Sequence, residues 1–179
     1  MKNCLVISLI FFVKIAFSQV IDNFGDGNFS SSPKWTGSSD DHFLVVNNQL
    51  RSNSTTASSN FYSSTENLLA NNCVWEFYCN LQFATSGSNY VDVYLTSDKA
   101  DLQATGINGY FVRIGNTTDE ISLYRRSGNT TAKLIDGLDA SVSSTSNNRI
   151  KIKVSRTADN TFTLERDVTG NGTNLLKEG

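Results

Sequence analysis

Alternation of apolar and polar side chains is the feature that most limits how this chain can fold. It is clearest in CVWEFYCNLQF, residues 73–83, where every second residue from Cys73 to Phe83 is apolar. Successive side chains of a β-strand point to opposite faces of a sheet, so this run predicts a strand with one face in a core. Residues 90–97 show the same alternation. We therefore expect both strands to contribute apolar faces to one core.

Similar short runs, separated by polar turns, extend along most of the chain. Helix signals are almost absent, and Ser, Thr, Asn and Gly are frequent between the runs, which is typical of an all-β chain. We expect about eight or nine strands from these candidate runs: residues 42–46, 49–53, 59–62, 73–83, 90–97, 109–115, 120–126, 132–136, 149–156 and 161–166. A chain of 179 residues is long enough for one domain with its own core.

The N-terminus has the three parts of a secretory signal peptide. A basic start, MKN, precedes the apolar run LVISLIFFV, and small residues at Ala16 and Ser18 mark a cleavage site. The apolar run is far shorter than the roughly 20 residues that cross a bilayer, so we expect no transmembrane anchor after cleavage. We expect removal of residues 1–18 and a single β-sandwich domain, residues 19–179, that is secreted or displayed at the cell surface.

The net charge argues against one class of partner. The chain carries 15 basic and 17 acidic side chains, and loss of residues 1–18 would remove two lysines, which leaves a net charge of about −4. Binding to nucleic acid depends on neutralising phosphates with basic side chains. An acidic chain without a basic stripe therefore indicates no nucleic-acid partner.

Two pairs of strands can be aligned by placing their apolar faces together. Closing the ATSGSN loop, residues 84–89, predicts a hairpin with Leu81 opposite Val91 and Tyr78 opposite Tyr94. This alignment would place the polar residues of both strands on one face of one sheet.

The stretch GYFVRIGNTTDEISLYRR, residues 109–126, predicts a second hairpin. A turn at NTTD sets Val112 opposite Leu123 and Ile114 opposite Ile121 on the apolar side. The polar side of this hairpin would extend the polar face of the first one.

The combined polar face is the candidate ligand-binding site, and its members are Glu76, Tyr78, Asp92, Tyr94, Arg113 and Tyr124. Aromatic side chains offer flat surfaces for sugar rings, and charged side chains supply directed hydrogen bonds, so this mixture favours a carbohydrate ligand. A structural interpretation is about equally favoured: Arg113 pairs with Glu76 or Asp92, and the tyrosines pack under a loop. Glu120, at the end of the turn, is expected to be a solvated acid.

Two acidic loops are candidate calcium sites. Asp22 and Asp26 could bind calcium, although Asp and Gly also simply form turns. Asp167 and Glu178 fall at the first and twelfth positions of an EF-hand-like loop, but Thr169 replaces the usual Asp or Asn, so we expect a β-turn there. No other cofactor is expected.

Catalytic constellations are weak in this sequence. The only histidine, His42, stands beside two aspartates and is interpreted as a surface residue. The Glu-x-Asp-x-x-Glu strand motif of sandwich-fold glucanases is missing, and Glu76 stands alone on its strand. Cys73 and Cys79 would be roughly 20 Å apart along one strand, so we expect two buried, reduced core residues that are not bonded to each other.

Three stretches carry a family resemblance: DNFGDGNFSSSPKWTGSSDDHFLVVNNQL, VWEFYCNLQFATSGSNYVDVYLTSDKADL and NGYFVRIGNTTDEISLYRR. In this order they resemble the N-terminal region of secreted bacterial proteins that carry lamin-tail domains further along. The similarity covers most of residues 22–175 and implies an antiparallel jelly-roll β-sandwich of the concanavalin A-like, laminin-G-like kind. Further strands close the sandwich in that family, so the resemblance implies truncation at the C-terminal strands. Asn28, where the family has an acid, weakens the calcium interpretation.

Three functions remain open. The first is a non-catalytic secreted or cell-surface binding module that contacts an extracellular glycan or another surface protein through the polar face. The second is a purely structural N-terminal domain of a multidomain surface protein. The third, and least favoured, is a fragment of a glycan-active enzyme. Exposure of the tyrosine row would favour the first function, and its burial would favour the second.

Overall fold

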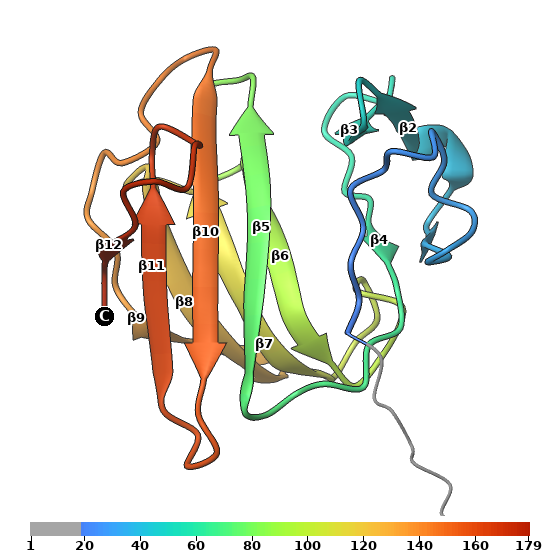
Figure 1. Cartoon of the computed structure of the whole chain (residues 1–179). Coiled ribbons are helices and arrows are strands. Elements are labelled where there is room, and N and C mark those ends of the chain that lie inside the picture. Colours follow the sequence, from blue (N-terminus) through green and yellow to red (C-terminus); the bar gives the residue numbers. More distant parts are fainter. Residues whose placement is uncertain (1–18) are drawn as a thin grey trace, which may run out of the picture.

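Two facing antiparallel sheets form the main body of the protein, as the computed structural model of residues 19–179 shows (Figure 1). The front sheet has the strand order β12-β11-β10-β5, and the meander sheet has the order β6-β7-β8-β9. This confirms the all-β class and is compatible with a β-sandwich. The predicted signal peptide lies outside the described residues. Within residues 19–179, no helix is long and apolar enough to cross a membrane.

The two large sheets differ in how their strands connect. The front sheet contains β5 (Cys73–Leu81), β10 (Asn148–Arg156), β11 (Phe162–Asp167) and β12 (Leu176–Lys177). The meander sheet contains β6 (Tyr90–Ser97), β7 (Ile107–Gly115), β8 (Glu120–Gly128) and β9 (Thr130–Ile135). Each meander strand pairs with the next one along the chain, whereas β10 pairs with β5 across a long stretch of sequence.

The core lies between the two large sheets and consists of side chains from both. On β10, Ile150, Ile152 and Val154 are fully buried, whereas the residues between them are only partly buried. The other buried members of the core are Leu81, Leu95, Val112, Ile114, Ile121, Leu123, Val142 and Leu164. Complete burial of one such side chain stabilises the fold by roughly 1.5–3 kcal/mol. The apolar side chains that alternate along each strand therefore hold the two sheets together.

The β7–β8 hairpin has the register that the sequence predicts. Val112 lies opposite Leu123 and Ile114 opposite Ile121, and all four side chains are buried. In the turn, Asn116 has a φ of 79°, a left-handed conformation that Asn adopts more readily than most residues. Alternation and turn chemistry are both local in sequence, which is why this register can be predicted.

The predicted pairing of residues 73–83 with residues 90–97 is wrong. β5 pairs with β10, and β6 pairs with β7, so Tyr78 lies opposite Lys151 and not opposite Tyr94. The chain leaves β5 in one sheet and enters β6 in the other. Both strands present an apolar face to the same core, so alternation identifies the buried side of each strand but not its neighbour.

An N-terminal lobe, residues 19–69, lies beside the edge formed by β5 (Figure 1). Its elements are β1 (Thr36–Gly37), η1, a 3-10 helix (Asp40–His42), β2 (Phe43–Val46), β3 (Gln49–Ser52) and β4 (Ser63–Ser64). Residues 59–62, a predicted strand, do not form one, and the short strands β1 and β4 pair with each other instead. Strands of two residues carry too little alternation for a sequence pattern to reveal them.

Cys73 and Cys79 are both free thiols, as the sequence predicts. Cys79 packs against the core, and burial raises the pKa of its thiol to about 12. Cys73 begins β5 and is only partly buried; burial raises its pKa, while the nearby Arg156 guanidinium opposes that shift. Only Cys79 is therefore a core residue.

We expect iodoacetamide to alkylate Cys79 far more slowly than Cys73 at pH 8. The thiolate is the nucleophile, so a thiol with a pKa of about 12 becomes reactive only near that pH or after unfolding. Timed alkylation followed by peptide mass spectrometry measures both rates. Replacing Cys79 with valine should change the free energy of unfolding by less than about 1.5 kcal/mol. Rapid alkylation of Cys79 in the folded chain would contradict this assignment.

Candidate functional site

The structure divides the predicted ligand-binding face between two sheets. Asp92, Tyr94, Arg113 and Tyr124 lie on strands of the meander sheet, on the side away from the core. Glu76 and Tyr78 lie on β5 of the front sheet and face solvent on the opposite side of the molecule. The six residues therefore do not form one site. The error follows directly from the wrong β5–β6 pairing, because only that hairpin would bring all six together.

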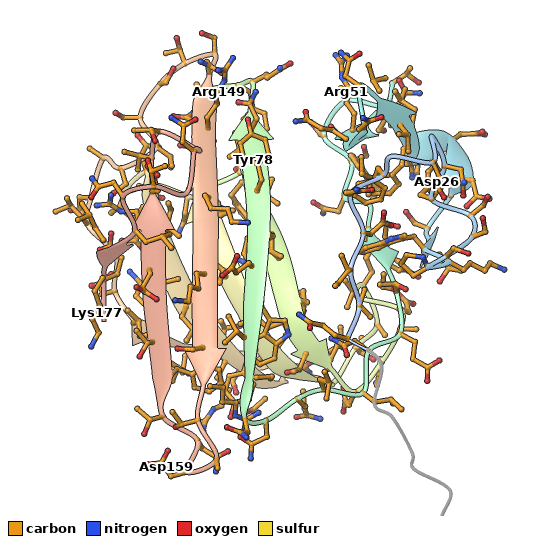
Figure 2. All side chains as sticks on the ribbon, in the orientation of Figure 1. Asp26, Arg51, Tyr78, Arg149, Asp159 and Lys177 are labelled. Atoms are coloured by element: carbon orange, nitrogen blue, oxygen red, sulfur yellow. The ribbon has the colours of Figure 1, made fainter. Side chains whose placement is uncertain are left out.

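The two front-sheet candidates lie among basic side chains of β10. The Glu76 carboxylate is 3.6 Å from the Lys151 ammonium group. Tyr78 is 39% exposed, and Figure 2 shows it near Arg149 at one end of the sheet. A Cβ atom at Gly170 would come within 3.0 Å of both Tyr78 and Arg149, so the loop after β11 packs directly on these side chains. This part of the front sheet is already in contact with the protein's own loop.

A row of stacked aromatic rings crosses the outer face of the meander sheet. The Phe111 ring centroid is 5.0 Å from that of Tyr94 and 5.3 Å from that of Tyr124. Phe111 lies between the two tyrosines and is only 2% exposed. Tyr124 is 9% exposed, and burial raises the pKa of its hydroxyl. The two faces of the Phe111 ring are therefore covered by Tyr94 and Tyr124 and are not open to a ligand.

Arg113 forms an ion pair with Asp92, one of the two partners that the structural interpretation of the sequence allows. Its Nε and Nη2 atoms donate to the two carboxylate oxygens of Asp92 at 2.7 and 2.8 Å. The guanidinium also lies 4.0 Å from the centroid of the Tyr90 ring. The hydrogen bond to Asp92 raises the pKa of Arg113. Pairing with Asp92 is thus confirmed, pairing with Glu76 is wrong, and the planar group is held rigidly on the face.

Glu120 is buried, which contradicts the expectation of a solvated acid. It is 2% exposed, and its carboxylate accepts a hydrogen bond from the Lys133 ammonium group at 2.6 Å. Lys133 also donates to Asp136, and these hydrogen bonds, that to Asp136 first, raise the lysine pKa. The two carboxylates therefore share one cation.

Arg126 is a member of this face that the predicted site omits. Its Nη1 atom donates to the Tyr94 hydroxyl at 3.1 Å, and its Nε atom donates to the Gly128 carbonyl at 3.3 Å. Residues two apart on a strand share a face, so Tyr124 on the polar side of β8 places Arg126 there too. This two-residue spacing is visible in the sequence, so Arg126 could have been included in the predicted site.

The open part of the meander face lies along the edge strand β6. The Tyr94 ring stacks on Phe111, and the Tyr90 ring lies against the Arg113 guanidinium. Tyr90 is 38% exposed and Tyr94 is partly buried. We define the β6 rim as Tyr90, Asp92, Tyr94, Arg113 and Arg126. In the described part of the chain, β6 has a neighbouring strand on one side only.

The predicted calcium ligands Asp22 and Asp26 contact protein donors. Asp22 accepts hydrogen bonds from the Phe24 amide at 2.8 Å and from the Trp35 indole at 2.7 Å. Asp26 accepts from the backbone and side-chain NH groups of Asn28. Residues 19–179 contain no group of three or more His, Cys, Asp or Glu side chains placed to hold a metal ion. The contacts agree with the turn-forming interpretation, and calcium binding stays a prediction.

The C-terminal loop is organised by Asp167. Its carboxylate accepts hydrogen bonds from the amide and hydroxyl of Thr169 and from the amides of Thr173 and Asn174. These bonds, that from the Thr169 hydroxyl first, lower the pKa of Asp167 to about 2. Glu178 instead forms an ion pair with an arginine of β11. The two acids of the EF-hand-like spacing therefore bind different protein groups.

Comparison with known proteins adds no assignment, because no family model, curated protein or solved structure matches this chain. The function must therefore be argued from the geometry of its faces.

Proposed function

We propose that this chain is a non-catalytic binding module of a secreted or surface-displayed protein, and that the β6 rim contacts a glycan. One observation carries the proposal. Tyr90 and Tyr94 are exposed or half-exposed on the same face of an edge strand, and the rigid Asp92–Arg113 pair lies between them. Residues four apart on a strand are about 13 Å from each other, so a linear ligand lying along β6 would pass both rings.

The chemistry of the rim suits a sugar chain. Tyrosine combines an apolar ring with a hydroxyl, and a ligand site needs a few fixed polar groups to orient what it binds. Arg113 and Asp92 are held by two mutual hydrogen bonds, and Arg126 is held by Tyr94 and Gly128. Because these groups are already fixed, binding would cost little side-chain entropy.

A purely structural role is the second candidate, and one observation favours it. Phe111, Tyr124 and Glu120 are almost completely buried on the same face, so much of it serves stability. Under this alternative the rim would bind nothing, and the domain would only space or display other domains. The proposal also includes export, a jelly-roll topology and membership of the lamin-tail-associated family. These three parts are supported by the sequence patterns alone.

We expect replacement of Tyr94 with alanine to weaken glycan binding roughly two- to tenfold, because loss of a ring contact costs about 0.5–1.5 kcal/mol. A glycan array identifies bound sugars, and isothermal titration gives the affinity. Tyr78→Ala is the control, since it removes a more exposed tyrosine from the other sheet and should leave binding unchanged. Absence of any glycan bound by the parent chain, or equal loss in both variants, would contradict the proposal.

A further inference from the structure

Within the described part of the chain, three cations lie on the outer face of the meander sheet, and two of them have carboxylate partners. Arg113 pairs with Asp92, and Lys133 pairs with both Glu120 and Asp136. The third cation, Arg126, has no acidic partner among the described residues; its hydrogen bonds go to the neutral Tyr94 hydroxyl and to a backbone carbonyl. This face therefore contains one positive charge that no acidic side chain of residues 19–179 neutralises.

The contacts of Arg126 leave most of its donors available. A guanidinium carries five N–H groups in a fixed plane, and Arg126 uses its Nε and Nη1 atoms for the two hydrogen bonds described. Nη2 makes no hydrogen bond with any residue of 19–179. The side chain is half-buried, so its position is restricted before any ligand arrives. Such a group is suited to paired hydrogen bonds with a planar anion such as a carboxylate.

We propose that the β6 rim recognises an acidic glycan, with Arg126 binding the carboxylate or sulfate of a sugar whose ring contacts Tyr94. This inference rests on the proposed function and names its ligand class. The hydrogen bond between Arg126 and the Tyr94 hydroxyl places the anion site directly beside the ring. The two sources of the anion, a uronic acid and a sulfated sugar, share this chemistry and are separated by experiment.

The overall negative charge of the chain excludes general electrostatic attraction as the cause of acidic-glycan binding, so a local contact such as that of Arg126 is required. The full chain has a net charge of −2. A negatively charged protein repels a polyanion at long range, so general electrostatic attraction would not produce binding. Affinity for an acidic polysaccharide would have to come from local, hydrogen-bonded contacts.

The test measures binding of the full chain to three polymers by isothermal titration. Polygalacturonate supplies carboxylates, dextran sulfate supplies sulfates, and dextran is neutral. We expect Arg126→Gln to weaken binding to at least one acidic polymer roughly tenfold or more, because a charge-assisted pair of hydrogen bonds is lost. Arg125→Gln is the matched control: it removes the same charge from the adjacent, exposed position and should change affinity by less than about twofold.

A second variant separates the anion contact from the support that Arg126 gives to Tyr94. Tyr94→Phe removes the hydroxyl but keeps the ring, and it should retain acidic-glycan binding within about threefold, since Arg126 keeps its charge and its hydrogen bond to the Gly128 carbonyl. Thermal melting shows whether each variant is folded. Equal affinity of Arg126→Gln and the parent, equal loss in Arg125→Gln, or a loss in Tyr94→Phe as large as in Arg126→Gln would overturn the inference.

The outcomes also distinguish this inference from the proposed function. Binding of neutral dextran that depends on Tyr94 but not on Arg126 would overturn the acidic ligand and keep the glycan-binding rim. No binding of any polymer, together with an empty glycan array, would overturn both.

Discussion

Replacing Phe111 with alanine should lower the free energy of unfolding by about 3–5 kcal/mol. Phe111 is 2% exposed although it lies on the outer face of its sheet, because Tyr94 and Tyr124 cover both sides of its ring. The substitution removes the buried ring and two stacked contacts, each of which adds about 0.5–1.5 kcal/mol beyond its area. The strands β6, β7 and β8 lose the side chain that joins them on that face.

Chemical denaturation measures this effect. Leu134→Ala, at a 43% exposed position on β9, is the control and should cost less than about 0.5 kcal/mol. A loss below about 1 kcal/mol in Phe111→Ala would show that the aromatic row does not stabilise the sheet. The explanation that Phe111 joins β6, β7 and β8 on that face would then be wrong.

The second large effect is expected at the C-terminal end of the chain, where Glu178→Ala should destabilise the fold by about 3–5 kcal/mol. Glu178 and Arg166 form an ion pair in which each side chain is only 8% exposed. The Glu178 carboxylate also accepts a hydrogen bond from the Leu138 amide at 2.9 Å. Removing the acid leaves a buried, uncompensated guanidinium and opens the contact between β11 and the loop after β9.

Two further variants test this explanation. Lys177→Ala changes the exposed neighbouring residue and should have an effect within about 0.5 kcal/mol. The double variant Arg166→Met, Glu178→Leu removes both charges and should recover most of the lost stability, because no buried charge is left alone. Equal destabilisation in the double variant and in Glu178→Ala would contradict the ion-pair explanation.

The predictable part of the fold is the part that depends on local sequence. The β7–β8 register follows from alternation and one turn, and Val112, Ile114, Ile121 and Leu123 are buried as expected. The choice of neighbour for β5 depends instead on β10, which lies far along the chain. No property of the two strands in isolation distinguishes a hairpin from two strands in facing sheets.

The candidate site was also predictable only where its strands are neighbours along the chain. Asp92, Tyr94, Arg113 and Tyr124 lie on one face as predicted, because their strands are neighbours in the meander. Glu76 and Tyr78 would share that face only if β5 paired with β6, and β5 pairs with β10 instead. The burial of Glu120 could not be foreseen, because it depends on Lys133 of β9 and on the Asp136 carboxylate that shares the same ammonium group.

The most direct test of the proposed β6 rim is a nuclear magnetic resonance titration of the isotope-labelled chain with oligogalacturonate and with a neutral dextran oligosaccharide. Amide shifts report which residues contact the added sugar. We expect shifts from at least one of the two sugars to be concentrated in residues 90–96 and at Arg113 and Arg126. Shifts concentrated on β5 and β10 of the front sheet, or none with either sugar, would contradict it.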